Sequence, residues 1–166
     1  MDHCLDCDAV IFAAGSGGQT GKDKTVLVDH IGAIRSMVAA EVQGARRYVM
    51  LSSINADESS ESKIAHYHKA KAMADRHLMD TELDWTIICP GGLRDDEGNG
   101  LVSVSKQTHR EGITTRDNLA TALVACLGGI GSGVLRSTSH RPGGGLDGVV
   151  ARHAELAVRH HPLQHL

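Results

Sequence analysis

The sequence of 166 residues has few aromatic side chains, no long apolar run and no excess of positive charge. Aromatic residues make up 2% of the chain, too few for the stacking platforms of proteins that bind single-stranded nucleic acids. Lys and Arg number 17 against 20 Asp and Glu, so the formal net charge of -3 offers no surplus cations to neutralise phosphates. No segment reaches the ~18 consecutive apolar residues of a membrane span. The sequence therefore predicts neither a nucleic-acid partner nor a membrane partner.

Cysteine is also scarce, with Cys4, Cys7, Cys89 and Cys126 showing no framework of a disulfide-rich secreted domain. Cys4 and Cys7 form a single C-x-x-C motif ahead of the first predicted strand. A redox pair of this kind would follow a strand and open a helix, and a zinc site would need a second pair. The N-terminal residues carry no basic segment of an export signal. We therefore expect a cytoplasmic protein without a metal site.

Composition divides the chain near residue 127. Residues 128–166 hold 8 of the 19 glycines and 5 of the 11 histidines, with little apolar periodicity. The histidines have no fixed ligand spacing, so they do not predict a metal site. We expect residues 1–127 to form the functional domain and residues 128–166 to form a weakly structured tail.

Apolar patterns in residues 1–127 alternate between strand and helix. Short apolar runs predict strands at residues 9–13, 48–51 and 85–89. Helices are predicted at residues 24–43, at 63–80 and from about 115 onward. In the first helix, one face carries apolar residues at steps of 4, 3, 4 and 4, the pattern of a helix face that packs on a core: Leu27, Ile31, Ile34, Val38 and Val42. This order predicts an α/β fold with a parallel sheet and flanking helices.

Ligands of such sheets bind beyond the carboxyl ends of the strands, here at residues 13–21, 52–62 and 90–100. The first of these loops is rich in glycine but does not match a phosphate-binding motif. Ser16 stands where a P-loop has its first glycine, and Asp23 stands where it has Ser or Thr. Thr20 stands where the dinucleotide fingerprint has its third glycine. The loop is better explained as a flexible part of an active site.

The second loop is followed by a pair of residues suited to proton transfer. Tyr67 and Lys71 are four residues apart on a predicted helix and so share a face, after a strand that ends in Ser52 and Ser53. A nearby ammonium lowers the pKa of a phenol, which makes proton transfer to a carbonyl oxygen practicable. A serine hydroxyl can hydrogen-bond the same oxygen. The spacing alone is weak evidence, but its place after Ser52 and Ser53 strengthens it.

Several segments in the same order resemble atypical short-chain dehydrogenase/reductases of the NAD(P)H-binding, NmrA-like group. The similarity extends over about residues 5–127 and includes residues 7–15, 23–25, 29–33, 49–53, 67–71, 86–93 and 113–117. It implies a partial Rossmann-like sheet, with NADP or NAD as cofactor and a small molecule as substrate. The catalytic set it implies is Ser53, Tyr67 and Lys71. The cofactor-binding residues it implies are Ala13, Ala14, Gly15, Ser52, Lys71, Pro90, Gly91, Gly92 and Leu93.

The family's first strand, glycine-rich turn and helix, which hold the pyrophosphate, have no counterpart in this sequence. We therefore expect impaired cofactor binding, and self-association through a sheet edge that the missing strands would cover. Three functions stay open. The chain is an oxidoreductase that transfers hydride to a small carbonyl, quinone or flavin-like acceptor, a non-catalytic NAD(P)H sensor, or a truncated inactive product.

Overall fold

The computed structural model describes residues 7–105, 112–128, 133–139, 149–152 and 155–156. Its sheet begins with three parallel strands in chain order, β1 (Ala9–Phe12), β2 (Arg47–Leu51) and β3 (Asp84–Pro90). All three strands predicted from apolar runs are confirmed, within two residues at each end. Parallel neighbours cannot be joined by a tight turn, so each connection is a helical crossover.

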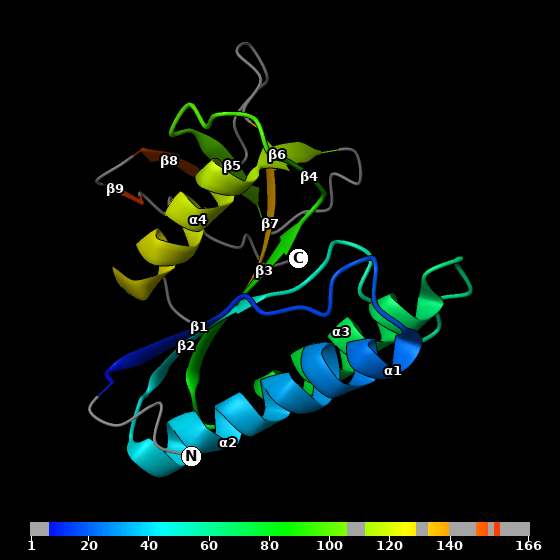
Figure 1. The fold of residues 1–166 in the computed structure, drawn as a ribbon. Helices are drawn as coiled ribbons and strands as arrows, with labels where there is room; N and C mark the ends of the chain where they lie inside the picture. Colours follow the sequence, from blue (N-terminus) through cyan, green and yellow to red (C-terminus); the bar gives the residue numbers. More distant parts are fainter. Residues whose placement is uncertain (1–6, 106–111, 129–132, 140–148, 153–154, 157–166) are drawn as a thin grey trace, which may run out of the picture.

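The first crossover is one long helix with a wider turn in its middle. It consists of α1 (Lys22–Thr25), the π-helix η2 (Val26–Gly32) and α2 (Ala33–Gln43). Gly44 ends it with a φ of 78°, a left-handed conformation that glycine adopts without strain. The second crossover is α3 (Ala65–Met79), which lies beside the first on the same side of the sheet (Figure 1).

The buried face of the first crossover helix is not the one that its apolar spacing predicts. Thr25, Asp29, Ala33, Met37 and Ala40 are buried, whereas the predicted stripe is exposed at three of its five positions and half-buried at the other two. The physical reason is packing distance, because two alanines in this face let the helix lie close to the sheet. The prediction of which face packs on the core was therefore wrong.

The sheet continues beyond β3 with strands that the sequence did not predict. β7 (Gly133–Ser139) pairs parallel with β3, and β5 (Val102–Ser105), β8 (Val149–Arg152) and β9 (Glu155–Leu156) extend the sheet in antiparallel pairs. The strand order is β1-β2-β3-β7-β5-β8-β9. Residues 128–166 were expected to be weakly structured, yet their described part supplies three strands. The rest of that segment lies outside the described residues, and the domain boundary at residue 127 stays a prediction.

The opposite face of the sheet is covered by α4 (Arg116–Ala125), which continues into the short η3 (Cys126–Gly128) (Figure 1). Thr115 caps α4 by accepting a hydrogen bond from the Asn118 backbone N–H at 3.2 Å, which agrees with the helix predicted from about residue 115. Just before α4, β6 (Ile113–Thr115) pairs parallel with β4 (Gly92–Arg94) in a separate two-stranded sheet.

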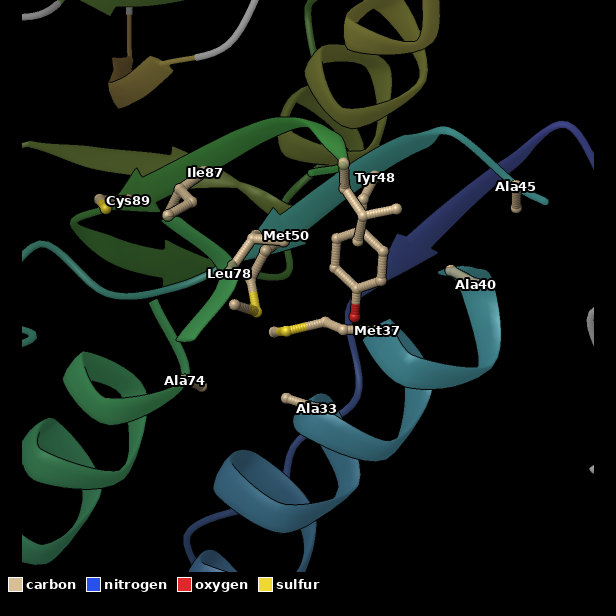
Figure 2. Packing of buried hydrophobic residues seen from close by; sticks show 11 residues of the cluster. Ala33, Met37, Ala40, Ala45, Tyr48, Met50, Ala74, Leu78, Ile87 and Cys89 are labelled. Carbon is tan, nitrogen blue, oxygen red and sulfur yellow. The ribbon is translucent and has the colours of Figure 1, made fainter. Parts of the chain in front are cut away.

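Two apolar cores lie on the two faces of the sheet. One packs α2 and α3 against β2 and β3, with Tyr48, Met37 and Met50 among its largest members (Figure 2). The other packs α4 on Val49 and Ile88. The half-buried β1 contributes to both, because Val10 and Phe12 face the first core and Ile11 faces the second. A sheet with helices on both faces confirms the predicted α/β class. No helix within the described ranges is both long enough and apolar enough to cross a membrane.

Candidate active site

Backbone hydrogen bonds join the carboxyl ends of β2 and β3. The Ser52 N–H donates to the Ile88 carbonyl at 2.8 Å, and the Ile54 N–H donates to the Pro90 carbonyl at 3.1 Å. The chain after β2 therefore runs directly along the end of β3. Residues 13–15 follow β1 at the same edge and are exposed. The structure thus places the beginnings of the three predicted loops at one edge of the sheet.

Helix α3 brings the predicted catalytic side chains together. Lys71 Nζ lies 5.9 Å from the centroid of the Tyr67 ring, and the Ser53 side chain lies near enough to the Tyr67 phenol to lower its pKa. Tyr67 is half-buried and Lys71 is buried. Ser53, Tyr67 and Lys71 therefore form one group at the end of β2, as their spacing in the sequence suggested.

The Lys71 ammonium has partners that the sequence analysis did not identify. It donates a hydrogen bond to the Leu51 carbonyl at 3.1 Å and forms an ion pair with Asp29 Oδ1 at 3.2 Å. Asp29 is 1% exposed and is presented by the π-helix η2, which packs against α3. The ion pair thus fixes Lys71 between the two crossover helices.

Asp29 also anchors the glycine-rich loop after β1. Its Oδ2 accepts a hydrogen bond from the Ser16 N–H at 3.0 Å. A Cβ on Gly15 would lie 3.1 Å from Asp29 Oδ1, so a larger residue there would push against this carboxylate. The absence of a side chain at Gly15 therefore leaves room beside the Asp29 carboxylate.

A second buried carboxylate, Asp75, lies one turn beyond Lys71 on α3. The Ser52 hydroxyl donates to Asp75 Oδ2 at 2.5 Å, whereas Oδ1 is buried without a hydrogen bond. Burial raises the pKa of Asp75 to about 6, against the lowering effects of the Ser52 hydrogen bond and the Lys71 charge. The site therefore holds two carboxylates around one ammonium, an excess of negative charge in a buried place.

The pKa of Tyr67 is raised, whereas the sequence analysis expected it to be lowered. Burial raises the pKa of the phenol above its ordinary value of 10.0, the Asp29 carboxylate raises it further, and the Ser53 hydrogen bond opposes both. The expectation of a lowered pKa is wrong, because burial and the nearby Asp29 carboxylate together raise the pKa of the phenol. Tyr67 is consequently protonated at neutral pH.

The sequence does contain signals for the two carboxylates that the analysis missed. Asp75 continues the four-residue spacing of Tyr67 and Lys71, which places all three on one side of α3. Asp29 lies four residues after Thr25 and four before Ala33, on the face of the first crossover helix that is buried. The other face of this helix has the more regular apolar spacing, so the sequence analysis assigned that face to the core and did not single out Asp29.

The remaining predicted cofactor residues follow β3. A Cβ on Gly91 would lie 2.0 Å from the Gly112 carbonyl oxygen, so only glycine allows the chain to pass there. The Gly92 N–H donates to the same oxygen at 2.9 Å, and Leu93 packs against the core under α4. These contacts give Gly91, Gly92 and Leu93 a structural role, and their role toward a cofactor stays a prediction.

The sheet has four neighbouring parallel strands, helices on both faces and a Ser–Tyr–Lys group at its carboxyl edge, an arrangement that is Rossmann-like. The sequence profile of the NAD(P)H-binding family matches residues 2–129, and the chain belongs to this family. The resemblance inferred from the sequence is thereby confirmed.

Three relatives show how much of the family's length the chain represents. It is 45% identical over 123 residues to the "Uncharacterized sugar epimerase YhfK" of Bacillus subtilis, covering 73% of this chain and 57% of that protein. A "Putative NAD-dependent epimerase/dehydratase" from Bacillus halodurans is similar with a TM-score of 0.74 and 37% identity, covering 80% of this chain and 64% of that one. The oxidoreductase ylbE from Lactococcus lactis has a TM-score of 0.67 and 32% identity, with 83% and 64% covered. The chain thus spans less than two thirds of each relative.

Proposed function

We propose that the chain carries the proton-transfer half of an NAD(P)H-dependent site that reduces a small carbonyl, quinone or flavin-like acceptor. The observation that supports this is the convergence of Ser53, Tyr67 and Lys71 at the carboxyl edge, where ligands of such sheets bind. The finer assignments, including substrate, cofactor and residue roles, are part of this proposal.

Each of the three side chains has a separate task. The raised pKa of Tyr67 keeps the phenol protonated, so it acts as the acid that protonates the acceptor oxygen during reduction. The Ser53 hydroxyl donates a hydrogen bond to the same oxygen and orients it. Lys71, fixed by Asp29 and the Leu51 carbonyl, keeps a positive charge beside the phenol. A bound nicotinamide nucleotide would supply the hydride that enters the acceptor carbon.

The residues at the edge fit a nucleotide in their size and exposure. Ala13, Ala14 and Gly15 are small and exposed, and Gly15 leaves room beside Asp29. In this proposal these residues lie along the nucleotide, together with Ser52 and the segment 90–93, and Lys71 contacts its ribose. The choice between NADP and NAD, like the identity of the acceptor, is not determined by these residues.

The test is titration of the purified chain with NADPH and with NADH, followed by a carbonyl and quinone reductase assay. We expect dissociation constants of micromolar or weaker, because the described residues offer no glycine-rich turn that matches the dinucleotide fingerprint. Tyr67→Phe should lower turnover by ~10²–10⁴-fold with little change in affinity, since only the transferable proton is lost. Tyr48→Phe is the matched control, because Tyr48 lies in the core and its hydroxyl bonds Ser36 at 2.6 Å.

A cofactor sensor without catalysis is the second candidate. The observation that favours it is the Lys71–Asp29 ion pair, which commits the ammonium to a carboxylate instead of to the phenol. A sensor would bind NADPH or NADH and show no turnover with any acceptor. Binding of either nucleotide without turnover, or equal turnover by wild type and a folded Tyr67→Phe variant, would contradict the reductase proposal.

A further inference from the structure

The loop that connects β2 with α3 joins two residues of the candidate site. It begins directly after Ser53 and leads into the first turn of α3, which carries Tyr67. Near the start of the loop, the Asn55 N–H donates to Ser53 Oγ at 3.4 Å, and the Ala56 N–H donates to the Ser53 carbonyl at 3.0 Å. The position of the Ser53 hydroxyl therefore depends on the course of this loop.

A buried histidine on α3 holds the later part of the loop. His68 is 6% exposed, and its Nδ1 lies 3.1 Å from the hydroxyl oxygens of both Ser60 and Ser62. The Ser60 hydroxyl also donates to the Ser62 hydroxyl at 3.2 Å, so the three side chains form a closed group. The His68 carbonyl accepts a hydrogen bond from the Asp57 N–H at 3.3 Å. Both ends of the segment 57–62 are thus attached to one residue.

A further contact between this segment and α3 is an ion pair at the surface. Glu58 lies 2.8 Å from Arg76, but the two side chains are 37% and 68% exposed, and such pairs contribute little to stability. The hydrogen bonds of His68 are shielded from water, so solvent competes with them less. His68 also follows Tyr67 directly in the chain, and the centroids of the two rings lie 5.8 Å apart. The residue that fixes the loop is therefore a direct neighbour of the phenol.

We propose that His68 is a positioning residue, which holds the segment 57–62 on α3 and thereby keeps the Ser53 hydroxyl beside the Tyr67 phenol. His68 does not touch the acceptor but acts through Ser53. In the reduction proposed above, Ser53 orients the oxygen that Tyr67 protonates, and a displacement of about 1 Å between such groups lowers a rate by up to ~10²-fold. The effect on turnover rests on that proposed function, whereas the position of Ser53 is measured without it.

The pKa of Tyr67 reports the position of Ser53, because the Ser53 side chain lowers it. We would measure this pKa by fluorine NMR on the full chain labelled with fluorotyrosine, using Tyr48→Phe to identify the signals of the two tyrosines. His68→Leu should raise the pKa, and His68→Leu/Ser53→Ala should raise it no further than Ser53→Ala alone. His68→Asn should keep the wild-type value, because its carboxamide can bond the hydroxyls in place of Nδ1.

The same result should follow when the contact is removed from the other side. Ser60→Ala/Ser62→Ala deletes both hydroxyls that meet His68, at positions that are half-buried and exposed, and should raise the Tyr67 pKa as His68→Leu does. This variant decides the question if His68→Leu does not fold. Ser59→Ala is the matched control, because the Ser59 hydroxyl donates to Asp57 Oδ1 at 2.7 Å instead of meeting His68.

Turnover completes the test. His68→Leu should lower the reduction of a carbonyl acceptor by ~10–100-fold with little change in the dissociation constant of NADPH, and His68→Asn should restore most of the rate. Absence of turnover in wild type would contradict the proposed function, and the pKa of Tyr67 would still decide the role of His68. An unchanged Tyr67 pKa in both His68→Leu and the double serine variant would overturn the positioning role. Shifts that add in His68→Leu/Ser53→Ala would also overturn it, because His68 would then act independently of Ser53.

Discussion

A buried cation lies at each end of strand β2, Arg47 of the strand itself and Lys71 of α3, and the two differ in their hydrogen-bond partners. At the amino end, the Arg47 guanidinium donates to the Cys126 carbonyl from two nitrogens at 3.1 and 2.7 Å, to the Asp84 carbonyl at 2.7 Å and to the Thr86 hydroxyl at 2.6 Å. At the carboxyl end, Lys71 donates to the Leu51 carbonyl and forms an ion pair with Asp29 Oδ1 at 3.2 Å, while Asp75 Oδ1 is buried without a hydrogen bond.

The difference separates a cluster with a structural role from the cluster that we propose to be functional. The Arg47 guanidinium connects β2 and β3 with the Cys126 carbonyl directly after α4. Each of its nitrogens donates to an acceptor within the protein. The Lys71 cluster leaves Asp75 Oδ1 without a hydrogen bond and holds surplus negative charge at the edge where ligands of such sheets bind. Buried polar groups left incompletely bonded are rare in folded proteins and are typical of sites that bind or react.

The largest effect should come from the structural cluster. Arg47→Met removes every donor to the Cys126 carbonyl that the guanidinium supplies, and we expect the free energy of unfolding to fall by about 3–5 kcal/mol. Urea denaturation followed by circular dichroism measures it. Arg76→Met is the control, because the ion pair of Arg76 with Glu58 is exposed and should contribute less than about 1 kcal/mol. A similar loss of unfolding free energy in both variants would show that the Arg47 cluster stabilises the fold no more than an exposed ion pair does.

An intermediate effect should come from the Lys71–Asp29 pair. Lys71→Met leaves two carboxylates in a buried site without a cation, and we expect a loss of about 2–3 kcal/mol. The double variant Lys71→Met/Asp29→Asn should recover at least about 1 kcal/mol, because it also removes the charge left behind. Denaturation of both single variants and of the double variant completes the cycle. Additive losses would show that the two side chains are not coupled, and the cluster would then be misassigned.

The sequence predicted the parts of the fold whose apolar pattern is local. β1, β2, β3 and both long crossovers follow from runs and periods within single segments. β7 follows a glycine-rich stretch and is placed in the sheet by its pairing with β3, a contact between distant parts of the chain that no local pattern contains. For the same reason Tyr67 and Lys71, four residues apart, were found, whereas Asp29 was not. Asp29 meets Lys71 only because η2 packs against α3.

The smallest effect is a pH dependence of stability that depends on Asp75. Its folded-state pKa of about 6 lies above its ordinary value of 3.8, so the folded chain holds the proton more tightly than the unfolded chain. The stability from this group is fully present below about pH 4 and is lost as pH rises through 6. Going from pH 7.5 to 5.5 should therefore raise the contribution of Asp75 by about 1 kcal/mol.

Asp75→Asn should remove this part of the pH dependence, because an amide does not titrate, while the Ser52 hydroxyl can still donate to its oxygen. Asp84→Asn is the matched control, since Asp84 belongs to the Arg47 cluster and its side chain is 51% exposed. The measurement is urea denaturation of the three chains at pH 5.5, 6.5 and 7.5, with the difference between wild type and variant taken at each pH. If that difference is constant for Asp75→Asn, the carboxyl group does not gain its proton in this range. The surplus negative charge assigned to the carboxyl edge of the sheet would then be present at every pH tested, and Asp75 would add to burial and Asp29 in raising the pKa of Tyr67.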